Sequence, residues 1–242
     1  MSCRCLAVAC LCLVATGGCN TFTSQGRNSQ GVVLFQRGQY QEALREFQEA
    51  SYDDPNNPDA YYNLGATYHQ LGKLRTLPED LARAETCYRQ CLDRNPNHRD
   101  CHRGLAVLLA EQGRTDEAFR SLQSWVDQQP TASEPKIELA RLHEEFGNRS
   151  AAKERLVEAL TTDPQNAQEW AALGRIREQS GEYAQALANY QRSLEINRSQ
   201  PEVAGRVAAL QTTLARQTPA VVPTAVPAGQ TPTLASPPTS LR

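Results

Sequence analysis

Large apolar residues recur at helical spacing through the middle of the chain. Tyr61, Leu64 and Tyr68 occupy positions i, i+3 and i+7, which places the three side chains on one face of a helix. A second apolar stretch containing Tyr88 follows, and it ends before Pro96 because proline cannot continue a helix. The pattern therefore predicts two amphipathic helices, each with one apolar face to bury.

This helix pair is repeated along the chain, as three independent series of residues show. Equivalent alanines are Ala43, Ala84, Ala118, Ala152 and Ala186. Equivalent glycines are Gly38, Gly72, Gly113, Gly147 and Gly181, and equivalent prolines are Pro55, Pro96, Pro130 and Pro164. Within each series neighbours are 34 residues apart, except for one interval of 41. Repeats of this length predict a stack, because one helix pair cannot bury its apolar face alone.

The repeat resembles the tetratricopeptide repeat, whose pattern is W-x2-L-G-x2-Y followed by A-x3-F and P. Trp170, Leu173 and Gly174 match the opening of that pattern literally, whereas the first unit has Arg27 in place of the aromatic residue. The resemblance implies an all-α, right-handed superhelical solenoid of about five helical hairpins with a C-terminal capping helix.

These markers divide the chain into nine segments. They are a signal peptide (1–18), a short tether (19–23), repeat units at 24–57, 58–98, 99–132, 133–166 and 167–200, a capping helix (201–216) and a Pro/Thr-rich tail (217–242) that we expect to be disordered.

The second unit carries the seven additional residues. Seven residues make nearly two helical turns, so a longer second helix keeps its apolar face in register. We expect the chain to turn at Gly72. We expect the longer second helix to begin at Pro78, with Glu79 and Asp80 in its first turn. A flexible loop is the alternative.

The first nineteen residues, MSCRCLAVACLCLVATGGC, read as an export signal. One basic residue, Arg4, precedes an apolar run that is too short for a permanent membrane span. The ending resembles a bacterial lipoprotein signal, which implies cleavage before Cys19 and acylation (diacylglycerol and palmitate-type chains) of that residue. Asn20 after it favours the outer over the inner membrane in that resemblance. An ordinary cleaved signal, or a cytosolic protein that keeps this segment, remains the alternative.

The charge balance and the positions of the cysteines limit the classes of partner and of metal site that the sequence supports. The chain has 25 basic and 27 acidic residues, which removes the electrostatic argument for a nucleic-acid partner. Three of the eight cysteines, Cys87, Cys91 and Cys101, lie beyond the first nineteen residues, and their spacing with His98 and His102 matches no familiar zinc motif. We expect buried thiols, with a Cys91–Cys101 disulfide as an open alternative, and no metal or cofactor.

Catalytic motifs are absent from the sequence. His143-Glu144 lacks the second histidine of H-E-x-x-H, and there is no G-x-S-x-G, P-loop or dinucleotide fingerprint. Because the repeats, capping helix and tail account for nearly the whole sequence, we expect no catalytic domain and no small-molecule substrate.

The resemblance implies that a partner peptide or helix binds in a concave groove lined by the first helix of each unit. Transferred groove positions are Tyr62, Asn63, His69, Arg103, Glu138, Arg141, Glu144, Arg175 and Glu178. The carboxylate clamp of chaperone-binding members is absent, because Val32 and Asp100 stand where asparagine and lysine are required. The arginines either attract an acidic partner or are balanced by neighbouring glutamates.

These features together predict a membrane-anchored protein–protein interaction scaffold of the bacterial cell envelope, facing the periplasm or the exterior. The combination of lipid and repeats also resembles pilotin-type lipoproteins that assist type IV pilus or secretin assembly. A third hypothesis is a regulatory subunit of an envelope enzyme.

Overall fold

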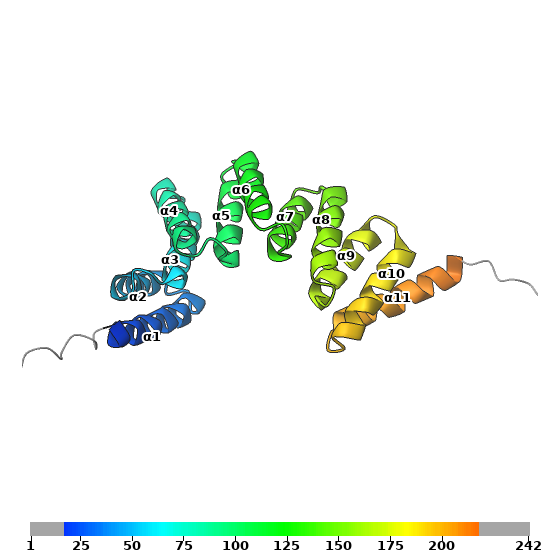
Figure 1. The fold of residues 1–242 in the computed structure, drawn as a ribbon, viewed down its shortest axis with the longest axis horizontal. Helices are drawn as coiled ribbons and strands as arrows, with labels where there is room; N and C mark the ends of the chain where they lie inside the picture. The colour runs from blue at the N-terminus through cyan, green and yellow to red at the C-terminus, as the bar shows by residue number, and fades with distance from the viewer. Residues whose placement is uncertain (1–16, 218–242) are drawn as a thin grey trace, which may run out of the picture.

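A computed structural model of the chain describes residues 17–217, and all regular secondary structure in that range is α-helical (Figure 1). The helices are α1 (Gly17–Gln36), α2 (Tyr40–Asp53), α3 (Pro58–Arg75), α4 (Pro78–Arg94), α5 (Arg99–Glu111), α6 (Thr115–Gln128), α7 (Glu134–Glu145), α8 (Arg149–Thr162), α9 (Ala167–Gln179), α10 (Tyr183–Ile196) and α11 (Pro201–Gln217). None of these helices is both long and apolar enough to cross a bilayer.

The helices form successive antiparallel pairs that follow one another along an arch, with the first and last helices at opposite ends (Figure 1). Each helix packs on the next, and α1 also contacts α3, α3 contacts α5, and α5 contacts α7. The odd-numbered helices therefore share one side of the stack, which we call the odd-helix face. This arrangement confirms the predicted all-α solenoid.

The alanine series lies in the hydrophobic core of the helix pairs. All five alanines are 0% exposed. Glycine has the same role in the facing helix: a methyl group on Gly65 would lie 2.8 Å from the ring of Tyr88, and one on Gly174 equally close to Tyr190. Larger residues at these positions would force the paired helices apart.

Four glycines of the repeat series end a first helix in the left-handed conformation. Gly38, Gly113, Gly147 and Gly181 have φ between 74° and 78°, which costs little only for a residue without Cβ. Gly72 differs, because it lies inside α3, and Thr76 (φ 55°) adopts the left-handed conformation instead.

The seven-residue surplus lengthens both helices of the second pair. α3 has 18 residues against 12 or 13 in α5, α7 and α9, and α4 has 17 against 14 in α2, α6, α8 and α10. The predicted start at Pro78 is confirmed, but the predicted turn at Gly72 is wrong. α3 gains five or six residues and α4 gains three, so α3 continues past Gly72, which leaves room for Leu81.

The N-terminal end also differs from the expected layout. α1 begins at Gly17, so residues 19–23, expected to form a tether, are helical, and no proline interrupts them. Ser24 is buried and its hydroxyl donates to the carbonyl of Ala50 at 2.8 Å, which attaches α1 to α2. Apart from a few residues at their inner ends, the predicted signal peptide (1–18) and tail (217–242) lie outside the described residues.

The last helix closes the stack. Leu210 of α11 is buried with Ala186 and Tyr190 of α10, and Val203 and Val207 pack beside them. The apolar face of the fifth pair is thereby covered, as a terminal unit of a solenoid requires.

A disulfide bond links Cys91 near the end of α4 to Cys101 in the first turn of α5, with Cα atoms 6.5 Å apart. The second and third helix pairs are thus joined covalently. Cys87 is a buried free thiol, and burial raises its pKa to about 11, so it stays protonated at neutral pH.

Candidate functional site

All nine predicted groove residues lie on odd-numbered helices. Tyr62, Asn63 and His69 belong to α3, Arg103 to α5, Glu138, Arg141 and Glu144 to α7, and Arg175 and Glu178 to α9. They do not converge on one point. Most of them instead join one odd-numbered helix to the next.

Glu138 is the centre of the largest ionic cluster on this face. Its side chain is only 2% exposed, and its two oxygens accept from Arg103 (Nε to Oε2, 2.8 Å, with a second Arg103 nitrogen on Oε1) and from Arg99 (Nε to Oε1, 2.7 Å). Burial alone would raise the pKa of Glu138, but the bonds from Arg103 and Arg99 outweigh it, and the pKa lies below its ordinary value.

Arg141 continues this cluster towards α9. Its guanidinium lies 3.6 Å from Glu138 and 3.5 Å from the buried carboxylate of Glu169. Burial raises the pKa of Glu169, because Arg141 compensates its lost hydration only in part. Further along, Arg175 of α9 bonds Glu144 of α7 at 2.9 Å. The arginine row predicted from sequence is therefore balanced by the chain's own glutamates.

The α3 residues make structural contacts. Asn63 donates to Asn28 of α1 at 2.9 Å, and His69 lies 2.8 Å from Glu111 of α5. The Tyr62 ring stacks on His98 with centroids 5.6 Å apart. Burial raises the pKa of the Tyr62 hydroxyl. These side chains hold successive repeats together, which limits how far they can move to meet a partner.

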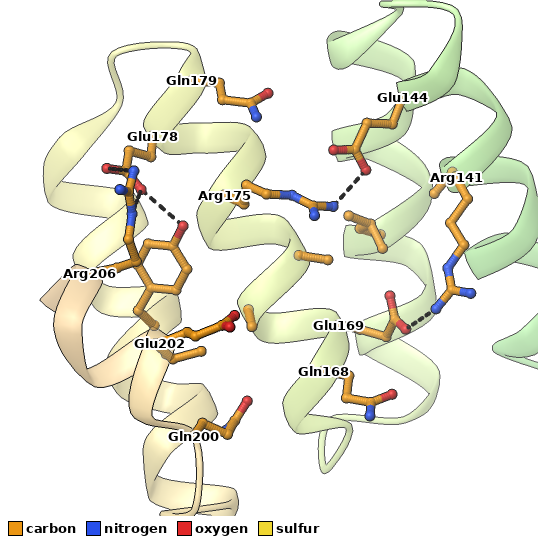
Figure 2. Close-up of a pocket in the computed structure, with 16 residues that line it drawn as sticks. Arg141, Glu144, Gln168, Glu169, Arg175, Glu178, Gln179, Gln200, Glu202 and Arg206 are labelled. Atoms are coloured by element: carbon orange, nitrogen blue, oxygen red, sulfur yellow. Dashed lines mark hydrogen bonds and ion pairs between the residues drawn. The ribbon is translucent and has the colours of Figure 1, made fainter.

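A cavity of about 730 Å³ opens on this face between α7, α9 and α11. Its walls include four predicted residues, Arg141, Glu144, Arg175 and Glu178 (Figure 2). Figure 2 shows Arg175 reaching towards Glu144 and Arg141 towards Glu169. The ion pair of Glu178 with Arg206 lies on the opposite wall (Figure 2). Its apolar lining comes from Ala140, Leu156, Ala171, Ala172, Tyr190 and Val203.

The wall contributed by α11 was not foreseen from the sequence. Arg206 bonds Glu178 (Nε to Oε2, 3.0 Å), and the same carboxylate oxygen accepts from the Tyr190 hydroxyl at 3.0 Å. The sequence patterns also did not indicate five further polar lining residues, Gln168, Glu169, Gln179, Gln200 and Glu202. Treating 201–216 as one more first helix of a repeat would have pointed to Glu202 and Arg206.

A smaller cavity of about 260 Å³ lies between α5, α6 and α7, lined in part by Arg103, Val107, Leu122 and Glu145. Both cavities combine an apolar floor with a charged rim. The main charged side chains of each rim already form ion pairs with other residues of this chain. Such a surface suits apolar anchoring of a partner with polar contacts around it.

One group of three possible metal ligands comes together within residues 17–217. It consists of Cys91, His98 and Cys101 at the junction of α4 and α5, and it includes none of the predicted groove residues.

Four repeat models match the chain. A "TPR repeat" model covers residues 31–72, and three "Tetratricopeptide repeat" models cover 79–133, 109–176 and 169–204. The matches begin in the first predicted unit and end just after the fifth.

Curated relatives share only part of their length with this chain. Human protein O-mannosyl-transferase TMTC3 is 27% identical over 179 residues, which are 70% of this chain and 20% of that protein. Cellulose synthase operon protein C of Pseudomonas fluorescens (strain SBW25) is 29% identical over 127 residues, 49% of this chain and 10% of that protein. The chain thus spans a fifth or less of either relative.

Solved structures share the fold. A thermophilic tetratricopeptide repeat protein of Thermus thermophilus superposes with a TM-score of 0.56 at 23% identity, covering 78% of this chain and 99% of that one. The pilF protein of Pseudomonas aeruginosa superposes with a TM-score of 0.53 at 18% identity, covering 83% of this chain and 94% of that one.

Proposed function

Because this chain is a tetratricopeptide repeat protein, we propose that it is a non-catalytic scaffold that holds a partner peptide or helix against its odd-helix face. The observation that carries the proposal is the cavity of about 730 Å³ between α7, α9 and α11. Its size lies within the range of specific binding pockets, and it is built by three consecutive odd-numbered helices.

The ion pairs of this face decide how the partner is recognised. Arg103, Arg141 and Arg175 each have a glutamate partner, so an acidic ligand must compete with contacts that already exist. Exchanging one ion pair for another brings little net free energy. The partner therefore binds mainly by placing apolar side chains on the floor of the cavity, with polar contacts at the rim.

A bulky side chain at the rim tests this proposal. Gln168 is exposed and lines the cavity, so Gln168→Trp is expected to obstruct it without disturbing the core. We expect at least a tenfold loss of partner proteins co-purified from detergent-solubilised membranes, measured by quantitative mass spectrometry.

Gln191→Trp is the matched control, because Gln191 is exposed on α10 outside this cavity. It should leave recovery of partners unchanged. Recovery of the same proteins in equal amounts with both variants would contradict binding at the cavity.

We further propose that the scaffold is anchored by lipid at Cys19 in the bacterial cell envelope, with the outer membrane favoured. Support comes from the lipoprotein-like ending of the first nineteen residues and from the Cys91–Cys101 disulfide, a bond that persists in oxidising compartments such as the periplasm. Several acyl chains on one residue are enough for stable anchoring, whereas one chain is not.

Replacing Cys19 tests the anchor. Cys19→Ser is expected to move most of the protein from the membrane fraction to the soluble fraction, and the mass of the wild-type N-terminus should correspond to an acylated Cys19. Cys12→Ser, a control within the same segment, should leave fractionation unchanged. A wild-type chain that keeps residues 1–18 with an unmodified Cys19 would rule the anchor out.

A pilotin-like role in pilus or secretin assembly is the second candidate. It is favoured by the combination of a lipoprotein-like signal with this repeat fold, which the pilF structure shares. The capture experiment separates the two hypotheses, because a pilotin-like protein must recover a secretin or pilus-assembly subunit through the cavity. A regulatory role would be indicated by recovery of an envelope enzyme.

A further inference from the structure

Three metal-binding side chains meet where the second helix pair joins the third. The two sulfur atoms of Cys91 and Cys101 and a ring nitrogen of His98 all lie within 4.8 Å of one another. The α4–α5 turn creates this geometry: the amide of Asn95 donates to Cys91 O at 2.9 Å, and the amide of His98 donates to Asn95 O at 3.0 Å. The sequence spacing did not predict a metal site, because the turn, and not a familiar motif, brings the ligands together.

Two hydrogen bonds fix the tautomer of His98 and the orientation of its ring. Nε2 of His98 lies 2.9 Å from Oδ1 of Asp59, so it carries the proton and donates to that carboxylate. Nδ1 then holds the lone pair, which accepts a hydrogen bond from the amide of Cys101 at 3.2 Å and would exchange that bond for a metal ion. A carboxylate on the far nitrogen fixes the tautomer and strengthens the near nitrogen as a ligand.

We propose that Cys91, His98 and Cys101 bind a zinc ion when the disulfide is reduced. A dithiol reductant supplies two electrons and two protons, the S–S bond breaks, and two thiols form while the reductant becomes a disulfide. Zinc binding then displaces both thiol protons to solvent, and the two thiolates and the neutral imidazole become ligands. The disulfide and the zinc site exclude each other, because both use the same two sulfur atoms.

The donor set selects the metal. Two thiolates and one imidazole suit zinc, which commonly takes four ligands in a tetrahedral arrangement. Three come from the chain, so a water molecule completes the coordination. Cys87 lies outside the group although it is one helical turn from Cys91. The site therefore couples the oxidation state of the α4–α5 junction to metal binding.

Zinc titration of the reduced full-length chain tests the site. The cysteines of the first nineteen residues are replaced by serine to remove competing thiols, and a phosphine reductant opens the disulfide. We expect one zinc ion per reduced chain, measured by competition with a chromophoric chelator, and none per oxidised chain. Cobalt in place of zinc should show thiolate-to-cobalt charge-transfer absorption.

Matched variants separate this site from other thiols. His98→Asn keeps a capping side chain at the start of α5 but removes the imidazole, and it should weaken zinc binding at least tenfold. Cys87→Ser should bind zinc as the parent does. The proposal is overturned if the reduced chain binds no zinc, whether or not circular dichroism shows it folded, or if His98→Asn binds zinc as tightly as the parent.

Discussion

Tyr88→Ala is expected to lower the free energy of unfolding by about 3–5 kcal/mol, the usual cost of removing a buried aromatic side chain. Tyr88 is 2% exposed, and its ring fills the space left by Gly65 on α3 and Gly104 on α5. The side chain therefore packs within the second helix pair and against the third. Its loss leaves a cavity at a junction between repeats, where each repeat depends on its neighbours. Urea unfolding followed by far-ultraviolet circular dichroism measures the change.

Tyr52→Ala is the matched control for this prediction. Tyr52 lies on α2 and is 82% exposed, so its replacement should change the free energy of unfolding by no more than about 0.5 kcal/mol. Equal destabilisation by the two variants would mean that the packing of Tyr88 does not hold the second and third repeats together.

The repeated parts of this fold were predictable because each is marked several times. An alanine at every 34th or 41st residue indicates a position where no larger side chain fits, and the structure buries each alanine completely. Prolines after the second helices indicate where each pair ends. Periodicity combines these weak signals, since an error at one unit is corrected by the others.

The non-repeated part was not fully predictable. Gly72 belongs to the glycine series, yet it packs inside α3 against Leu81, while Thr76 forms the turn. Sequence spacing reveals that seven residues are inserted between Gly72 and Ala84 but not how two antiparallel helices share them. Packing between the two helices decides this: α3 gains five or six residues, α4 gains three, and the two lengthened helices pack on each other.

The candidate site, like the fold, was predictable from the sequence only in part. The sequence placed its residues on the odd-numbered helices, but not which charges pair across them. Arg103 meets Glu138 over 35 residues, Arg175 meets Glu144 over 31, and Arg206 meets Glu178 over 28. These separations are close to one repeat, so a search for opposite charges about one repeat apart would have found them. The cavity itself depends on how α7, α9 and α11 stack, which no local pattern encodes.

Glu138→Gln is expected to lower the free energy of unfolding by about 3 kcal/mol at pH 7. The variant keeps the size of the side chain but removes the buried charge that Arg99, Arg103 and Arg141 share. Removing one partner of a buried ionic cluster costs about 3–5 kcal/mol, and the lower end applies because these arginines are partly exposed. Urea unfolding at several pH values measures the loss.

The pH dependence distinguishes lost charge from altered packing. The pKa of Glu138 is lower in the folded chain than in the unfolded one, so its stabilisation is complete above the unfolded pKa of about 4.3 and is lost as the pH falls through the folded value. The difference between wild type and Glu138→Gln should therefore shrink at acid pH. Glu195→Gln removes an exposed partner of Arg192 and should cost less than about 1 kcal/mol at any pH. A pH-independent loss in Glu138→Gln would show that shape, not charge, makes Glu138 important to the stack.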